Sequence, residues 1–201
     1  NRTSGVRLAD FIDEGELRAE LDNVRALRFN NSDLHYLRGT DEYGARMFVG
    51  DYLEFLQDLR LPDYYLEKVD GNYILEFSGL WAEAIYWEVP ALAIVNELYF
   101  RSRMNQLSRF GRDNIFAMGK CRLGEKIKRI RANPDIRFSD FGTRRRFSRE
   151  WQDYVVGVLA EEVPQQLLGT SNVVFANKHG LVPMGTSAHE RDMATAAILR
   201  S

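Results

Sequence analysis

The sequence predicts an α/β protein in which an N-terminal α+β region precedes repeated strand–turn–helix units. The two-residue turn Asp70-Gly71 joins two strands of alternating polarity, which is typical of an antiparallel hairpin. Later in the chain, three short apolar strands each lead through a Gly-Thr pair into a helical pattern. The pairs begin at Gly142, Gly169 and Gly185. This repetition favours either a β/α barrel or a doubly wound parallel sheet.

The expected N-terminal elements follow from apolar spacing and capping residues. In order, they are a strand at 6–11, helices at 13–28 and 33–37 (the second capped by Ser32), a helix capped by Asp51, hairpin strands at 65–69 and 72–77, and a helix from Leu80 that Pro90 interrupts. These elements alternate helices with an antiparallel ribbon, which is an α+β pattern.

The expected elements of the second region follow from the same signals. They are an irregular segment at 111–119, a helix at 120–131, a strand at 136–141, a helix at 149–162 capped by Ser148, a strand at 164–168, a helix at 172–179 ended by Gly180, a strand at 181–184 and a helix at 188–199. In both candidate folds, ligands bind at the carboxyl ends of the strands, where the three Gly-Thr turns lie.

Composition describes an ordinary globular chain. Its 201 residues are 45% hydrophobic and 28% charged, and the single cysteine, Cys121, permits no internal disulfide. One free cysteine fits a reducing compartment, so we expect a cytoplasmic protein. The longest apolar-rich segment, 80–100, contains three glutamates and a proline, and we therefore expect no membrane span.

Charge is distributed unevenly along the chain. The net charge is −2, yet residues 101–149 hold 15 Lys and Arg against 4 Asp and Glu, which gives this segment a net charge of +11. Such asymmetry favours an anionic ligand or a nucleic acid. Aromatic residues are not interleaved with the basic ones as a base-stacking surface requires, so we expect no nucleic-acid partner.

His189 lies at the start of the last expected helix. Ser187 and Glu190 have the spacing of a capping box, which places His189 in the first helical turn. Free N–H groups and the helix dipole bind anions there, and the same field keeps an imidazole neutral. The position favours a histidine that accepts a phosphate. A first-turn histidine with no chemical task is the alternative.

The first Gly-Thr turn carries Arg144, Arg145 and Arg146 just before a helix N-terminus. Positive charge at that end is unfavourable by about 0.3–1 kcal/mol per exposed residue. A bound anion would offset it, and the guanidinium fork matches phosphate oxygens. Alternatively, these side chains reach solvent or neighbouring carboxylates.

The three turns contribute further candidate ligand contacts. Phe141 is the last residue of its expected strand. Its ring either faces a flat ligand or packs into the core. Ser171 and Asn172 offer neutral donors and acceptors at a helix start, and the hydroxyls of Thr170 and Thr186 are expected along the same rim. Together with the arginines and His189, these residues predict a site for a phosphorylated, anionic substrate. The chain contains no CxxC, HExxH or P-loop motif, and we expect no metal-ligating residues.

Four segments together resemble the nicotinate phosphoribosyltransferase family in order and spacing. They are Trp87-Glu88-Val89-Pro90, the stretch FSDFGTRRRFS at 138–148, Gly169-Thr170-Ser171-Asn172-Val173 and Gly185-Thr186-Ser187-Ala188-His189-Glu190. The resemblance covers nearly the whole chain and about the first half of the family's length. It implies an N-terminal α+β domain with connecting helices at 1–132 and the first part of an irregular, TIM-like α/β barrel at 133–201.

The resemblance also implies a reaction. Enzymes of this kind join nicotinate to 5-phosphoribosyl 1-diphosphate, giving nicotinate mononucleotide and diphosphate in NAD salvage. ATP hydrolysis is coupled through a phosphohistidine, Mg²⁺ assists, and the enzyme is a homodimer. By this likeness His189 is the catalytic, phosphorylated histidine.

Further residue roles come from the same likeness. It implies that Thr186 contacts nicotinate, that Phe141 stacks on the pyridine ring and that Arg144 binds diphosphate. Ser171 stands where the related nicotinamide enzyme has an aspartate, and a neutral hydroxyl suits a substrate that carries a carboxylate. We expect this segment alone to be an incomplete enzyme. The alternative is a non-catalytic truncated homologue that binds ligands or acts as a scaffold.

Overall fold

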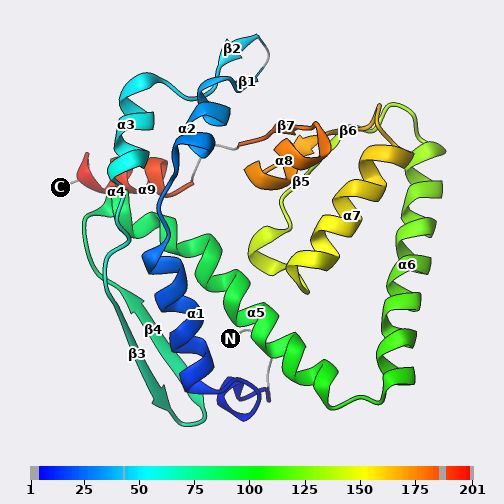
Figure 1. Cartoon of the computed structure of the whole chain (residues 1–201), viewed down its shortest axis with the longest axis horizontal. Coiled ribbons are helices and arrows are strands. Elements are labelled where there is room, and N and C mark those ends of the chain that lie inside the picture. The colour runs from blue at the N-terminus through cyan, green and yellow to red at the C-terminus, as the bar shows by residue number, and fades with distance from the viewer. Residues whose placement is uncertain (1–4, 43, 186–188, 200–201) are drawn as a thin grey trace.

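The computed structural model describes residues 5–42, 44–185 and 189–199 (Figure 1). The elements of the N-terminal region are η1 (Leu8–Asp10), α1 (Glu14–Ala26), α2 (Asn31–Arg38), β1 (Asp41–Glu42), β2 (Ala45–Arg46), α3 (Gly50–Asp58), β3 (Tyr64–Val69), β4 (Asn72–Phe77), α4 (Trp81–Ala84), η2 (Ile85–Trp87) and α5 (Glu88–Asn105). The second region contains α6 (Arg109–Arg131), β5 (Phe138–Asp140), η3 (Thr143–Arg145), α7 (Arg149–Glu162), β6 (Leu167–Thr170), α8 (Val173–His179), β7 (Val182–Pro183) and α9 (His189–Ile198). Antiparallel hairpins in the first region and a parallel sheet in the second confirm the predicted α/β class.

The β3–β4 hairpin forms as predicted. Its register pairs Val69 with Asn72 across a two-residue turn. Asp70 and Gly71 have φ angles of 50° and 76°, the positive values that a type I′ turn requires.

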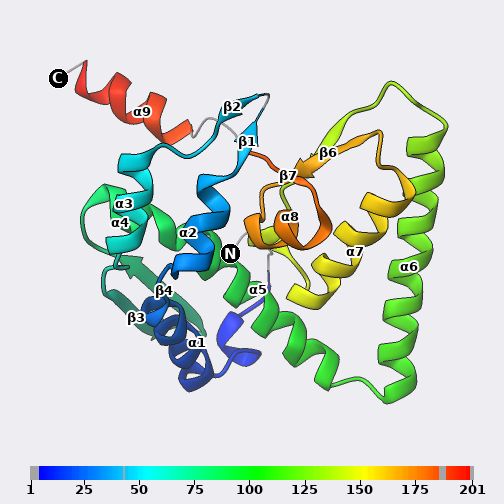
Figure 2. The same ribbon diagram turned by 45° about the horizontal axis from the view of Figure 1, so that its top comes forward.

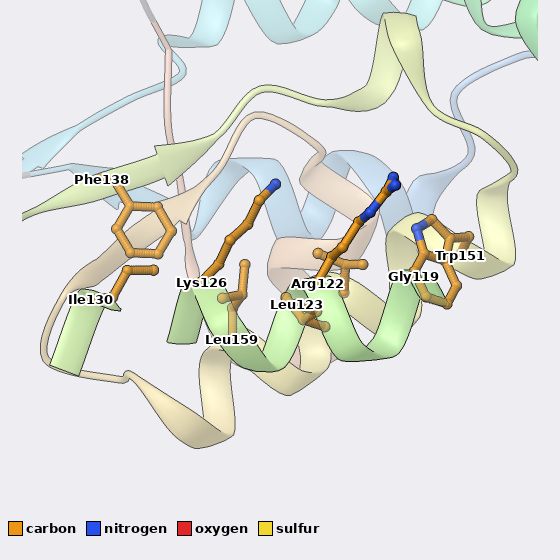
Figure 3. A pocket seen from close by; sticks show the side chains of 9 residues that line it. Gly119, Arg122, Leu123, Lys126, Ile130, Phe138, Trp151 and Leu159 are labelled. Carbon is orange, nitrogen blue, oxygen red and sulfur yellow. The ribbon is translucent and has the colours of Figure 1, made fainter. Parts of the chain in front are cut away.

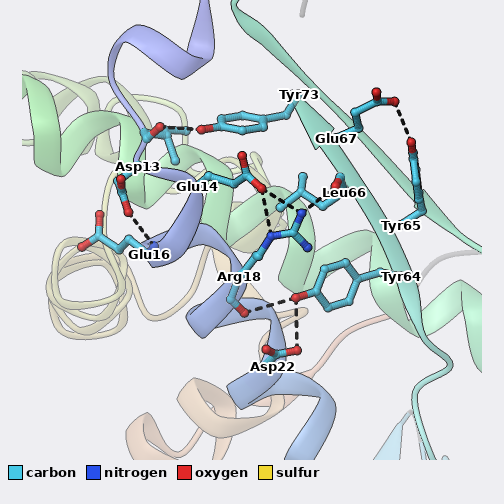
Figure 4. A network of polar contacts seen from close by, with 11 residues as sticks. Asp13, Glu14, Glu16, Arg18, Asp22, Tyr64, Tyr65, Leu66, Glu67 and Tyr73 are labelled. Atoms are coloured by element: carbon cyan, nitrogen blue, oxygen red, sulfur yellow. Dashed lines mark hydrogen bonds and ion pairs between the residues drawn. The ribbon is translucent and has the colours of Figure 1, made fainter. Parts of the chain in front are cut away.

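Hydrogen bonds join the hairpin to α1 (Figure 4). The Arg18 guanidinium donates to the Leu66 carbonyl at 2.7 Å, and the Tyr64 hydroxyl donates to Asp22 at 3.1 Å. From β4, the Tyr73 hydroxyl donates to the Ile12 carbonyl at 2.8 Å. These bonds hold α1 across one face of the hairpin, where both elements contribute to a shared core.

Two apolar clusters stabilise the N-terminal region. The first joins η1, α1, the hairpin and α5, and its buried members are Ile12, Leu17, Leu21, Leu66, Trp87, Ala91 and Leu98. The second joins α2 to α3 and the segment after it, through Leu34, Leu37, Leu53, Leu56 and Leu59. Residues spaced three or four apart on each helix supply these contacts, which is the spacing that predicted the helices.

Three sequence predictions for this region are wrong. The segment expected as a strand at 6–11 contains a 3₁₀ turn, because helical spacing turns Leu8, Phe11 and Ile12 toward one cluster. Asn30, not Ser32, caps α2, since its side chain accepts N–H bonds while Asp33 bonds back to the Asn30 N–H. Helix α3 begins one residue before Asp51, and no side chain caps it.

Helix α6 is continuous, although residues 111–119 were expected to be irregular. Two glycines bound that segment, Gly111 and Gly119, and the second has a packing role. A Cβ on Gly119 would lie 2.8 Å from the Trp151 ring, so the absence of a side chain lets α6 approach α7 closely. Both views show α6 beside α7 at the edge of the molecule (Figures 1 and 2).

The second region contains a three-stranded parallel sheet in the order β5-β6-β7. Ser148 caps α7 and Gly180, with φ of 64°, ends α8, both as predicted. Strand β6 lies two to three residues later than expected, because Gly169 belongs to the strand. A Cβ there would lie 2.0 Å from the Val182 carbonyl oxygen, so only glycine permits this pairing with β7.

The core of this region is formed by α6, α7 and β6, through Leu123, Ile127, Leu159, Val163 and Leu167. That this sheet is the first part of a TIM-like barrel, and that a domain boundary lies at residue 132, stay predictions. In the described part of the chain, no helix is both long enough and apolar enough to span a membrane.

Candidate functional site

The candidate site lies at the carboxyl ends of β5 and β6. The Ser171 N–H donates to the Asp140 carbonyl at 2.8 Å, which brings the turn after β6 beside the turn after β5. Parallel pairing produces this proximity, because Asp140 and Thr170 are register partners. Two of the three predicted turns therefore share one edge of the sheet.

A buried polar network supports this edge. The Asp140 carboxylate accepts three hydrogen bonds, from the Gly142 N–H at 3.1 Å, the Gln152 amide at 2.9 Å and the Thr170 hydroxyl at 2.8 Å. The Thr143 hydroxyl oxygen accepts two, from the Gln152 amide at 3.0 Å and the Asn172 amide at 3.1 Å. The network thus joins β5, α7 and β6 to η3, the turn that carries the arginines.

Thr170 and Asn172 were both expected on the rim, and their side chains are already engaged. Thr170 is fully buried and directs its hydroxyl into the network rather than along the rim. Asn172 is half-buried and caps α8 through a bond from the Phe175 N–H at 3.2 Å, while its amide group reaches Thr143. Their substrate-binding roles stay predictions.

The three arginines of the turn have different surroundings. Arg144 forms an exposed ion pair with Glu88 of α5. Arg146 is more buried and pairs with Glu97 of α5 at 2.5 Å. The Arg145 side chain is exposed and forms no ion pair or hydrogen bond with the described residues. Two of the arginines therefore reach neighbouring carboxylates, the alternative that the sequence left open.

The start of α7 adds a negative charge near this turn. The pKa of the Glu150 carboxyl is lowered, first by a hydrogen bond from its own backbone N–H and second by the Ser148 hydroxyl. Arg149 and Arg146 lower it further. This carboxylate therefore stays ionised at neutral pH and partly offsets the arginine cluster.

Phe141 and Ser171 present side chains that a ligand can reach. Phe141 is 45% exposed at the end of β5, so its ring does not pack into the core. Ser171 is half-buried, and its hydroxyl forms no hydrogen bond with the described residues. The site therefore offers an open aromatic face and a neutral hydroxyl next to the arginine turn.

Two predicted site residues have side chains that lie outside what the structure describes. Thr186 lies outside the described residues. His189 begins α9, as the capping-box pattern indicated, but its side chain lies outside what the structure describes. Their predicted roles therefore stay predictions.

A pocket of about 560 Å³ lies elsewhere, between α6, α7 and Phe138 at the start of β5 (Figure 3). Arg122 and Lys126 line it together with Trp151 and apolar side chains. None of the predicted site residues contributes to it. The pocket lies at the amino end of β5, away from the carboxyl ends of the strands, where ligands of open α/β sheets bind. We therefore assign the candidate site to the turns.

The described residues do not form a metal site of their own. They contain no cluster of three or more His, Cys, Asp and Glu side chains that could hold an ion. The Asp140 carboxylate, which accepts the Gly142 N–H of the turn, is already satisfied by its three hydrogen bonds. The described residues therefore hold no cage of protein ligands for Mg²⁺.

Sequence reasoning missed Gln152 of α7 and Glu97 of α5, which both anchor the turn. The signal for Gln152 was present, since it shares a helix face with the buried Val156 and Leu159. A polar residue at a core position requires a hydrogen-bond partner. Glu97 had no comparable signal, because its contact with Arg146 joins residues that are distant in sequence.

Fold and site together define a mixed α/β protein whose candidate site is built on loops at the ends of parallel strands. Comparison with known families gives two matches. Residues 1–96 match the nicotinate phosphoribosyltransferase (NAPRTase) N-terminal domain, and residues 136–200 match the NAPRTase family model. The chain belongs to the nicotinate phosphoribosyltransferase family.

Solved structures agree with this assignment. A nicotinate phosphoribosyltransferase from Vibrio cholerae superposes with a TM-score of 0.75 at 29% identity, covering 92% of this chain and 43% of that one. One from Porphyromonas gingivalis gives 0.72 at 30% identity, covering 91% and 43%. A Saccharomyces cerevisiae chain gives 0.66 at 27% identity, covering 92% and 47%. The chain thus spans less than half the length of these relatives.

Proposed function

We propose that the protein acts as a nicotinate phosphoribosyltransferase, joining nicotinate and 5-phosphoribosyl 1-diphosphate to give nicotinate mononucleotide and diphosphate. One observation carries the proposal beyond the family assignment. An exposed arginine turn, an exposed Phe141 ring and a neutral Ser171 hydroxyl occupy one edge of the sheet. These groups match the diphosphate, the pyridine ring and the carboxylate of the two substrates.

Departure of diphosphate is the step that needs positive charge. As the bond between the ribosyl carbon and oxygen breaks, negative charge develops on the leaving group, and positioned cations lower the barrier. Arg144 can supply this charge by exchanging Glu88 for a diphosphate oxygen. Exposed ion pairs contribute about 0–1 kcal/mol, so the exchange costs little.

The nitrogen substrate is recognised by an aromatic ring and a hydroxyl. Stacking on Phe141 would hold the flat pyridine ring, and the Ser171 hydroxyl can donate to the nicotinate carboxylate. An aspartate at position 171 would repel that carboxylate and favour nicotinamide instead. The neutral side chain therefore supports nicotinate as the substrate.

We extend the proposal to ATP coupling through phosphorylated His189, with Mg²⁺ assisting. The position of His189 at the first residue of α9 supports it, because N–H groups at a helix N-terminus favour a phosphate. The described residues hold no cage of protein ligands for Mg²⁺, so the ion is assigned to no side chain of the chain. A cytoplasmic homodimer without nucleic-acid or membrane partners completes the proposal.

The test uses the protein at its natural length, incubated with nicotinate and 5-phosphoribosyl 1-diphosphate, with and without ATP. We expect nicotinate mononucleotide to form faster with ATP, with acid-labile phosphate on His189 and much weaker turnover of nicotinamide. Arg144→Ala is expected to raise the KM for 5-phosphoribosyl 1-diphosphate about tenfold or more. Arg129→Ala, an exposed arginine on α6, is the matched control.

Two results would contradict the proposal in different ways. Binding of nicotinate or diphosphate without product would support the non-catalytic homologue. Full ATP-stimulated turnover in His189→Ala would remove the phosphohistidine from the proposal while leaving the transferase reaction in place.

A further inference from the structure

The Gln152 side chain is buried, yet half of its amide has no partner. It is 5% exposed, and its Oε1 atom forms no hydrogen bond with any described residue. Burying an unpaired carbonyl oxygen lowers stability. An apolar side chain of similar length would avoid this loss but would also give up the bonds of the amide nitrogen, so those bonds are what an amide supplies at this position.

The nitrogen of the Gln152 amide forms two hydrogen bonds. Nε2 donates to the Asp140 carboxylate at 2.9 Å and to the Thr143 hydroxyl oxygen at 3.0 Å. These acceptors flank Phe141 and Gly142 in the chain. A single NH₂ group thus bridges the two ends of the short segment that carries the exposed aromatic ring and leads into Arg144.

The amide assignment is fixed by its partners. If Oε1 and Nε2 were exchanged, the carbonyl oxygen would face the Asp140 carboxylate, and two acceptors would meet without a proton. Nε2 therefore points toward Asp140 and Thr143, and the unpaired Oε1 lies on the other side of the amide group. The Asn172 amide, at the N-cap of α8, adds a second, independent bond to Thr143 at 3.1 Å and so supports the same segment.

We propose that Gln152 is a positioning residue, whose amide bridge between Asp140 and Thr143 holds the 141–144 segment in the conformation that binds substrate. This inference rests on the proposed function. The side chain touches no substrate itself. It acts through the placement of Phe141 and Arg144, and shifts of about 1 Å in such groups reduce rates up to about a hundredfold.

The test compares Gln152→Met, which keeps length but removes both donors, with Gln166→Met as the matched control. Gln166 is also buried, at 9% exposure, but it lies at the other end of β6. We expect Gln152→Met to keep the unfolding midpoint near that of the wild type and to raise the KM for 5-phosphoribosyl 1-diphosphate about tenfold. The control is expected to keep its KM.

A second pair of variants tests the proposal even if Gln152→Met fails to fold. Thr143→Val removes the hydroxyl that accepts the bridge, whereas Thr143→Ser keeps it. We expect the valine variant to reproduce the rise in KM and the serine variant to restore the wild-type value. An unchanged KM in Thr143→Val, or in a folded Gln152→Met, would overturn the proposal. So would a lower unfolding midpoint accompanied by an unchanged KM.

Hydrogen–deuterium exchange separates this inference from the proposed function. Amides of residues 141–146 are expected to exchange faster in Gln152→Met and Thr143→Val than in the wild type and in Gln166→Met. This readout needs no substrate. If the wild type forms no nicotinate mononucleotide, the transferase proposal fails, and the exchange rates still decide whether Gln152 holds the segment. Equal exchange in all variants would overturn its positioning role.

Discussion

Asp140 is the residue on which the hydrogen bonds of the candidate site converge. Its carboxylate accepts bonds from three different segments, which are the turn at Gly142, helix α7 at Gln152 and strand β6 at Thr170. A carboxylate accepts at both oxygens, whereas an amide presents a donor in place of one of them. Asparagine, the uncharged isostere of aspartate, therefore cannot accept all three of these hydrogen bonds.

We predict that Asp140→Asn lowers the free energy of unfolding by about 1–3 kcal/mol, because at least one buried donor loses its acceptor. Urea unfolding followed by circular dichroism at pH 7 measures the change. Asp135→Asn is the control, since Asp135 is exposed and has no described side-chain partner. Equal stability of the two variants would show that the network contributes nothing.

At the same scale, the sequence indicated which side chains lie at the strand end better than it indicated what holds them. Phe141 and the arginine cluster could be selected from their place after a strand and before a helix, whereas Arg144 was singled out by the family resemblance. Thr170 was assigned to the rim because its strand was expected to end earlier, and one residue decides which face a side chain occupies. The bridge made by Gln152 depends on tertiary distances that no local pattern contains.

At the scale of elements, α6 shows how a glycine can mislead. Gly119 contacts Trp151 so closely that a Cβ would lie 2.8 Å from the ring, whereas nothing lies within 4 Å of a Cβ on Gly124. Both residues weaken helix propensity equally, so sequence alone cannot separate them. Helix and strand types were nonetheless predictable wherever periodicity and caps agreed, as in α1, α7 and α8.

The two glycines of α6 therefore give a matched prediction. Gly124→Ala is expected to stabilise the protein by about 0.5–1 kcal/mol, through lower entropy of the unfolded chain. Gly119→Ala is expected to destabilise it by about 1–3 kcal/mol, because α7 must move away. Thermal unfolding of both variants provides the measurement. If both changes stabilised the protein, close packing of α6 on α7 would be disproved.

The contact between α7 and α8 predicts a pH dependence. The pKa of Asp153 is lowered, chiefly by its hydrogen bond with Lys178 and further by His179, whose Nε2 lies 2.7 Å from the carboxylate. A lowered pKa in the folded state stabilises the protein above the ordinary value of 3.8, and this contribution is lost as the pH falls below it.

Asp153→Asn should accordingly lower the free energy of unfolding at pH 7, by up to about 1 kcal/mol for this partly exposed pair. The difference from the wild type should shrink as the pH is lowered through 3.8 toward 2.5–3 (about one unit below the ordinary pKa). Urea unfolding at several pH values measures it. Glu161→Gln, on the same helix and exposed, is the control. A constant difference across the range would show that the carboxylate charge is not responsible.

At the scale of the whole molecule, α5 connects the two regions that the family models match separately. It packs against α1 in the N-terminal core and against the η3 turn of the second region. Figure 1 shows it running between the hairpin and α7. The Asn96 amide donates to the Arg144 carbonyl at 3.1 Å, and Glu97 bonds both the Arg146 side chain and the Arg149 N–H. The arginine turn is therefore held by the N-terminal region as well as by its own sheet.

This double attachment predicts that the two regions unfold together and that Glu97 couples them. The Arg146–Glu97 side chains are 17% and 28% exposed, whereas the Arg144–Glu88 pair on the same helix is 45% and 39% exposed. Solvent screens the exposed pair more strongly. Glu97→Gln should therefore lower the free energy of unfolding by about 1–2 kcal/mol, since it leaves a half-buried guanidinium without its charge partner.

Glu88→Gln, the control, should change the same free energy by less than about 1 kcal/mol. Urea unfolding followed by tryptophan fluorescence and by circular dichroism measures both variants and reports whether the two regions still unfold in one transition. We expect coincident curves for the wild type and a lower midpoint for Glu97→Gln. Equal effects of the two substitutions would mean that burial of the Arg146 pair adds nothing. The attachment of the turn to α5 would then depend on apolar packing and the Asn96 bond alone.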